Sequence, residues 1–162
     1  MPHDWIIYAC LITGVSSGLV AGVFQSFSDF IMRSLAAARP AAGIESMQMI
    51  NREVFRTMFM VLAWGTIPLS LALAIYAYIY LSSPASLLIV TGATIYFVVV
   101  FLVTMLGNVP MNQQLDGMDP FAEETTQYWK TYTVVWTRWN HVRTLGSLAT
   151  ALCFLMASIA LA

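Results

Sequence analysis

The stretch WTRWNHVRT at residues 136–144 gathers side chains capable of chemistry directly before an uncharged segment, residues 145–162. It holds two tryptophans, an asparagine, a histidine and two arginines. Of these, His141 is the side-chain type that titrates near pH 7, and Asn140 and Arg143 carry hydrogen-bond donors. These residue types could serve ligand binding or acid–base chemistry, or they could form hydrogen bonds at the end of a helix.

Further polar side chains recur near the ends of the apolar stretches of the chain. A buried amide or charge without a partner costs several kcal/mol in an apolar medium, so these groups should partner one another or a ligand. Two interpretations stay open, namely a polar cap that fixes helix register and a ligand or catalytic pocket. The residues concerned are Gln25, Asp29, Gln48, Asn51, Arg52, Asn108, Asn112, Asn140, His141 and Arg143.

The sequence offers little to a metal ion. It has no HxxH, ExxH or CxxC spacing, and Cys10 and Cys153 lie in separate apolar runs. A stable zinc or iron site generally uses three or four such ligands. We therefore expect no metal or other cofactor, although His141 as a single axial haem ligand stays open as an alternative.

Composition places the chain in a membrane. Of its 162 residues, 59% are hydrophobic and 9% are charged, and the mean hydropathy is +0.75. A soluble domain carries about 25% charged residues, so too few polar groups are present here to cover a water-facing surface. The net charge of -1 and the lack of a basic run exclude a nucleic-acid partner.

Four apolar stretches, each near the roughly 20 residues that cross a bilayer as a helix, divide the chain. They span residues 5–31, 57–81, 85–107 and 144–162. The first has no Lys or Arg before it and exceeds the apolar core of a signal peptide, so we expect a retained transmembrane helix. The sequence predicts an all-α integral membrane four-helix bundle, a single domain over residues 1–162.

Charge placement predicts the orientation of the bundle. All Lys and Arg residues flank the connections at 36–50 and 108–130, and the connection at 82–84 carries none. By the positive-inside rule these two connections face the cytoplasm of the inner (cell) membrane, and both termini face outside. The seven residues are Arg33, Arg39, Arg52, Arg56, Lys130, Arg138 and Arg143.

The helices are expected to extend beyond the membrane on the cytoplasmic side. A helical pattern begins at Ile44 and runs into the second apolar stretch. Asp119 and Pro120, followed by Glu123 and Glu124, are typical of an N-cap, a first-position proline and an acidic first turn. The fourth helix is therefore predicted to begin near residue 120 and to be about twice as long as the membrane is thick.

Four motifs resemble the anthrone-oxygenase-like membrane proteins, in particular their bacterial branch. They are GLVAGVFQSFSDFIM at 18–32, MQMINREVF at 47–55, GNVPMNQQL at 107–115 and WTRWNHVRT at 136–144. The resemblance covers nearly the whole chain. It implies a four-helix transmembrane fold and the oxidation of anthrone-like or phenolic compounds by dioxygen without metal or flavin.

Such a reaction needs a base, donors for an oxyanion and a flat aromatic slot. We expect His141 to be the base, with Asn140 and Arg143 stabilising the enolate oxygen as the other catalytic residues. The expected substrate-binding residues are Gln25, Gln48, Asn51, Asn108, Asn112, Trp129, Tyr132 and Trp136. We expect the amides and His141 to line one cavity at the cytoplasmic end of the bundle.

A non-catalytic role is the alternative. A small membrane subunit can pack in a larger complex or bind a lipid, a quinone or a haem. The tryptophans and Tyr132 would then form an interfacial aromatic belt, and Arg138 and Arg143 would anchor lipid phosphates. The expected partners are accordingly the lipid bilayer, a small hydrophobic aromatic ligand and a larger membrane complex.

Overall fold

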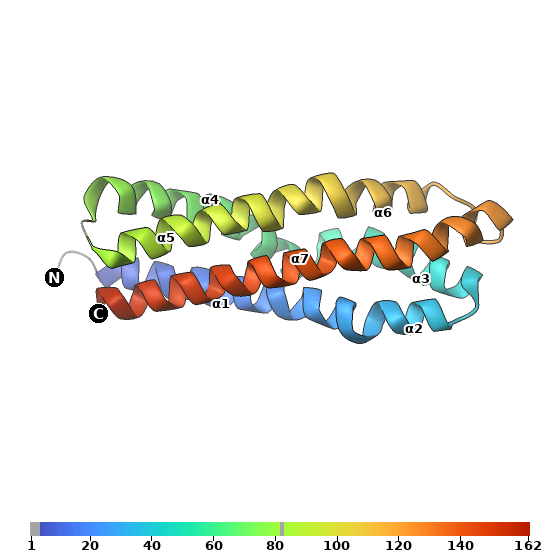
Figure 1. The fold of residues 1–162 in the computed structure, drawn as a ribbon, viewed down its shortest axis with the longest axis horizontal. Helices are drawn as coiled ribbons and strands as arrows, with labels where there is room; N and C mark the ends of the chain where they lie inside the picture. Colours follow the sequence, from blue (N-terminus) through green and yellow to red (C-terminus); the bar gives the residue numbers. More distant parts are fainter. Residues whose placement is uncertain (1–3, 82) are drawn as a thin grey trace.

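The computed structural model describes residues 4–81 and 83–162, and all regular structure within them is helical. Four long helical rods run up and down beside one another, and the first rod begins at the end of the bundle where the last rod ends (Figure 1). The predicted all-α four-helix bundle is confirmed. The predicted connection at 82–84 includes Ser82, which lies outside the described residues.

Three of the four rods change helix type along their length. The first consists of α1 (Asp4–Ser26), a π-helix (Phe27–Ile31) and α2 (Met32–Ala37). The second consists of α3 (Pro40–Glu53), a 3-10 turn (Val54–Arg56) and α4 (Met58–Tyr80). The third consists of α5 (Pro84–Ile95), two π-helices (Tyr96–Leu102 and Thr104–Asn108) and α6 (Val109–Asp116), and the fourth is α7 (Glu123–Leu161).

Four helices of the described chain are long and apolar enough to cross a membrane. They span Asp4–Ala37, Met58–Tyr80, Pro84–Asp116 and Glu123–Leu161. Each predicted apolar stretch falls on one of them, and the first, third and fourth helices extend well beyond the stretch. Such lengths exceed the roughly 20 residues that the hydrocarbon core requires.

The end of the bundle that carries the termini, here called the closed half, is packed by small and apolar side chains. Its core consists of Ile6, Cys10, Leu73, Ala77, Ala85, Ile89, Ala93, Phe154 and Ala157. A Cβ atom on Gly92 of α5 would lie 2.9 Å from Cβ of Cys153 on α7. The close approach also lets the Thr150 hydroxyl donate a hydrogen bond to the Gly92 carbonyl, at 3.2 Å. Small residues thus bring α5 and α7 into direct contact, as is common in membrane bundles.

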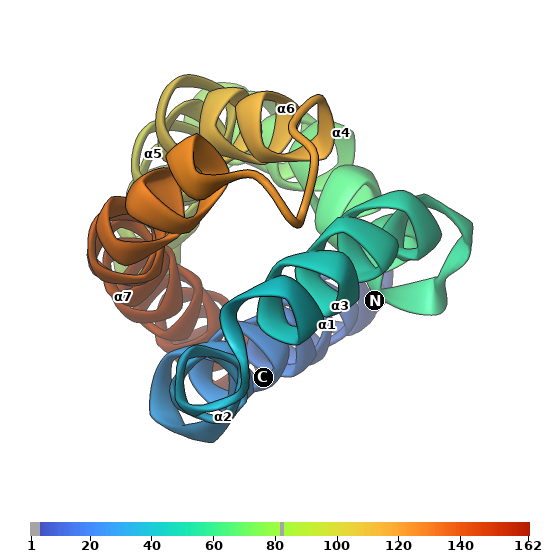
Figure 2. The same cartoon turned by 90° about the vertical axis from the view of Figure 1, so that its right-hand side faces the viewer.

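At the opposite end, here called the cavity half, the rods are joined by polar contacts. The Gln48 side chain of α3 donates hydrogen bonds to the carbonyls of Leu115 and Met118, at 2.8 and 2.9 Å. Arg52 of α3 and Asp116 of α6 form an ion pair at 2.7 Å. Viewed from this end, the rods surround a common axis (Figure 2). These contacts hold α3 against α6, while α2 contacts both α3 and α7.

The second rod is interrupted where the sequence predicted one continuous helix. α3 ends at Glu53, a 3-10 turn follows, and Thr57 is extended, with φ -107° and ψ 157°. The prediction of an unbroken helix from Ile44 into the second apolar stretch is therefore wrong. The pattern of apolar residues alone does not reveal this break.

The start of α7 also differs from the prediction. The helix begins at Glu123, and its N-cap is Ala122, which makes no side-chain cap. Asp119 instead accepts a hydrogen bond from the Phe121 backbone N–H at 3.0 Å, within the turn that precedes the helix. The assignment of Asp119 and Pro120 to the first helical positions is wrong, because Asp119 stabilises this separate turn.

Candidate functional site

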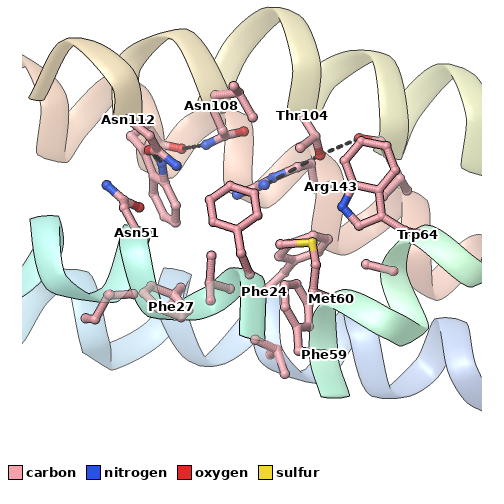
Figure 3. A pocket seen from close by; sticks show the side chains of 18 of the residues that line it. Phe24, Phe27, Asn51, Phe59, Met60, Trp64, Thr104, Asn108, Asn112 and Arg143 are labelled. Atoms are coloured by element: carbon pink, nitrogen blue, oxygen red, sulfur yellow. Dashed lines mark hydrogen bonds between the residues drawn. The ribbon is translucent and has the colours of Figure 1, made fainter. Parts of the chain in front are cut away.

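A cavity of about 500 Å³ lies inside the cavity half (Figure 3). All four rods contribute to its wall, which is mainly apolar and aromatic. The aromatic lining residues are Phe24, Phe27, Phe55, Phe59, Trp64, Tyr96, Phe101 and Trp136. The volume and lining are those of a site for a small, largely apolar molecule.

Irregular helical turns surround this cavity. The π-helix of the first rod supplies Phe27, and the two π-helices of the third rod supply Tyr96 and Asn108 among others. The 3-10 turn of the second rod supplies Phe55. Because π-turns shift the direction of the side chains that follow, they often occur at functional sites. All four irregular segments contribute lining residues, which links the backbone irregularity to the cavity.

Arg143 brings a buried positive charge to the cavity wall. Its side chain is 5% exposed, and its guanidinium carbon lies 4.2 Å from the ring centre of Phe24 and 5.3 Å from that of Trp136. Within residues 4–81 and 83–162 it has no carboxylate partner, and its Nε atom makes no hydrogen bond. Aromatic faces and neutral oxygens therefore stabilise this cation, which keeps its charge available to a ligand.

Asn140 holds the arginine in place from behind. Its Nδ2 group donates hydrogen bonds to the Phe24 carbonyl at 2.6 Å and to the Ser28 hydroxyl at 2.7 Å. Its Oδ1 atom accepts from Nη2 of Arg143 at 2.6 Å, while Nη1 of the arginine contacts the Thr104 hydroxyl at 3.5 Å. Both amide donors of Asn140 are thus occupied, and the residue is absent from the cavity lining. The geometry makes Asn140 a positioning residue rather than the predicted oxyanion donor.

Three asparagines complete the polar part of the wall. Oδ1 of Asn112 accepts hydrogen bonds from the Tyr132 hydroxyl at 2.8 Å and from Nε1 of Trp136 at 2.7 Å. Asn108 donates to the Trp136 carbonyl at 3.1 Å. Oδ1 of Asn108 and Nδ2 of Asn51 are buried without a partner. Together with Nε of Arg143, the cavity thus offers two unused donors and one unused acceptor.

The structure brings together only part of the predicted site. Asn51, Asn108, Asn112, Trp136 and Arg143 line the cavity. The other predicted residues, Gln25, Gln48, Trp129, Tyr132, Asn140 and His141, do not.

Each of the absent residues has another environment. The side chain of Gln25 is exposed, and Gln48 is occupied by the carbonyls that join α3 to α6. Trp129 stacks on Tyr132 with ring centres 5.4 Å apart, which places both in the aromatic core behind the cavity. Gln48, Trp129 and Tyr132 therefore support the wall from outside the cavity, whereas Gln25 takes no part in it.

The prediction that His141 lines this cavity is wrong. Its side chain is exposed on the outer surface of α7, where it borders a groove with Met32, Arg33 and Arg138. Asn140 and Arg143 face the inside of the bundle, and His141 lies about 100° around the helix from Asn140. Because Asn140 is buried inside the bundle, His141 points to the outer surface.

Sequence reasoning missed Asp116 and most of the aromatic wall. Asp116 is the one carboxylate among the lining residues, and it lies four residues after Asn112. That spacing, one helical turn beyond a residue already singled out, was a usable signal. The aromatic residues of the wall carry no such signal, because an aromatic side chain in an apolar helix can equally face lipid. The part of the chain that the structure describes contains no group of three or more His, Cys, Asp or Glu side chains suited to a metal ion.

Comparison with known protein families gives a match. A family model described as anthrone oxygenase matches residues 54–153, which is more than half of the chain. The matched segment contains α4, the third rod and most of α7, and with them Asn108, Asn112 and Arg143. No curated protein and no solved structure matches the chain.

Proposed function

The chain belongs to the anthrone oxygenase family. We propose that the protein oxidises an anthrone-like or phenolic aromatic compound with dioxygen inside its cavity, without metal or flavin. The aromatic walls would bind the flat ring system, and the four apolar helices would give such a compound access from the bilayer. The polar side chains of the cavity would then act on the reacting oxygen and carbon atoms.

The observation that carries this proposal is the burial of Arg143 at the cavity wall without a carboxylate partner among the described residues. A buried charge without an opposite charge is expensive, and the cost falls when an anion binds beside it. An anthrone or phenol gives such an anion when it loses a proton, with the negative charge on its oxygen. A fixed guanidinium in an apolar, water-poor site is an effective stabiliser of that oxyanion.

The reaction balances without a further reductant. Loss of a proton from the CH₂ carbon gives an enolate, which transfers one electron to dioxygen, and the resulting radical and superoxide combine into a C–O bond. The peroxide then loses water and leaves a carbonyl at that carbon. Each turnover consumes one dioxygen, puts one of its oxygen atoms into the product and releases the other as water.

We assign the role of proton acceptor to Asp116 rather than to His141. Asp116 lines the cavity, whereas His141 lies outside it. Its Oδ1 atom pairs with Nε of Arg52, and the side chain is 39% exposed, so the carboxylate can pass a proton on to water. A positioned carboxylate within reach of the substrate is a usual general base.

For the orientation in the membrane, we propose that both termini lie outside and that the connections after α2 and α6 face the cytoplasm. The Lys and Arg residues around these connections support this orientation. A cysteine introduced at Gly117 should react with a membrane-impermeant maleimide only after the cells are permeabilised. Reaction in intact cells would reverse the proposed topology.

Oxygen uptake by the purified protein tests the proposed activity. With an anthrone as substrate and a chelator present, we expect one dioxygen consumed per quinone formed, at a rate far above that of a membrane preparation from cells lacking the protein. Tight binding of the compound without any uptake would contradict the activity and favour the alternative, a non-catalytic protein that binds a quinone or a lipid.

A further inference from the structure

A second hollow lies on the outer surface between α2 and α7. This α2–α7 groove has a volume of about 320 Å³ and shares no residue with the aromatic cavity. Its apolar lining residues are Met32, Ala36 and Val134, and its polar ones are Arg33, Thr133, Thr137, Arg138 and His141. It therefore combines an apolar floor with basic side chains.

The basic side chains of the groove have no acidic partner. Arg33, Arg138 and His141 are all exposed, and the ion pair found among the described residues lies elsewhere, between Arg52 and Asp116. Lys130 lies two turns before Arg138 on α7 and adds to the positive charge, whereas Asp29, one turn before Arg33, forms no ion pair with any of them. The groove thus presents uncompensated positive charge.

The groove lies where the exposed surface changes from apolar to charged. Beyond His141, every exposed side chain of α7 is apolar, from Leu145 at 67% to Ile159 at 69%. On α1, the exposed residues from Trp5 to Gly22 are likewise apolar or uncharged. A bilayer covering those surfaces would place the groove at the level of the lipid headgroups.

We propose that the α2–α7 groove binds the phosphate of an anionic phospholipid. The guanidinium groups of Arg33 and Arg138 hold the phosphate from the two rods, and His141 borders the headgroup. Arginine suits this task because its planar group donates paired hydrogen bonds to phosphate oxygens. The continuous apolar surface beside the groove accommodates the acyl chains, which favours a lipid over free phosphate. This site is independent of the proposed oxygenase activity.

Native mass spectrometry of the delipidated full chain in detergent tests the site. Phosphatidylglycerol should bind more tightly than phosphatidylcholine, and the double substitution Arg33→Gln/Arg138→Gln should weaken its binding about 30-fold, since each surface arginine contributes a several-fold attraction. The control Arg39→Gln/Arg56→Gln removes the same charge from exposed arginines outside the groove. It should leave the affinity within about twofold of wild type.

Three results would overturn the proposal. Equal weakening by the two double substitutions would mean that net charge alone attracts the lipid. Equal affinity for phosphatidylcholine would mean that the headgroup charge is not recognised. Displacement of phosphatidylglycerol by millimolar inorganic phosphate would identify the groove as a site for a free anion.

Discussion

In the closed half, small residues bring the helices into contact, whereas in the cavity half polar side chains and irregular turns hold them around an open volume. The closed half buries alanines, Cys10 and Phe154 against one another. In the cavity half, Arg143 and three asparagines lie among aromatic rings. Together these side chains surround a cavity of about 500 Å³. The same four rods are therefore closely packed at one end and enclose a cavity at the other.

The difference shows how a small bundle can tolerate a buried charge. The segment of residues 57–107, which includes the packed parts of α4 and α5, contains no charged residue. Stability can therefore come from the closed half, while Arg143 in the cavity half is held by Asn140 and by the face of Phe24. Substitutions at the two ends should accordingly affect different properties.

The largest effect is expected at the carboxylate of the cavity. Asp116→Asn should lower turnover by about 10²–10⁴, the usual contribution of a general base. Arg52→Gln breaks the same ion pair but keeps the carboxylate, so it should retain most of the turnover. Oxygen uptake by the two purified variants measures both effects. Equal losses in the two would show that the ion pair, and not the base, is what the reaction requires.

The next largest effect is expected in the closed half, and on stability alone. Gly92→Ala places a Cβ atom 2.9 Å from Cβ of Cys153 and 3.0 Å from the Phe154 ring. Such overpacking typically costs about 1–3 kcal/mol of unfolding free energy. Gly65→Ala is the matched control, because its added Cβ meets no atom within 4 Å. In detergent, the unfolding temperature of Gly92→Ala should be lower than that of the wild type, and that of Gly65→Ala should be unchanged. Oxygen uptake at temperatures below unfolding should be unchanged in both variants.

The smallest effect is expected at His141, because it lies outside the cavity. His141→Ala should leave the rate of oxygen uptake within about twofold of wild type, in contrast to the 10²–10⁴ expected for loss of a base. A large loss of turnover in a folded His141→Ala protein would restore the sequence-based assignment and remove Asp116 as the proton acceptor.

Composition and charge predicted much of the fold, because a chain with 9% charged residues and four long apolar stretches has few other solutions. The polar residues Asn51, Asn108, Asn112 and Arg143 of the cavity were also recognisable, since amides and charges in apolar helices need partners.

Helical periodicity failed where the backbone departs from the α-helix. Steps of 100° per residue do not apply across the π-helices at 27–31, 96–102 and 104–108 or across the break at 54–57. Periodicity could not assemble the aromatic wall either, because four of its eight aromatic residues lie in these irregular segments and an aromatic side chain in an apolar helix can equally face lipid. On α7, which is a regular helix, the sequence predicted that both Asn140 and His141 face the cavity; Asn140 instead packs against Phe24 and Ser28 inside the bundle, and His141 is exposed outside.

Oxygen uptake and thermal unfolding of Arg143→Met test the central claim most directly. Methionine replaces the buried cation by an apolar side chain of similar length, which removes the cost of burying the charge but leaves Oδ1 of Asn140 without its donor, so the unfolding temperature should stay close to that of the wild type. Its turnover should fall by about 10²–10³, the loss expected for one strong oxyanion donor. Arg143→Lys keeps the charge, and its turnover should lie between those of the wild type and Arg143→Met. A folded Arg143→Met protein that oxidises the anthrone at the wild-type rate would contradict the account.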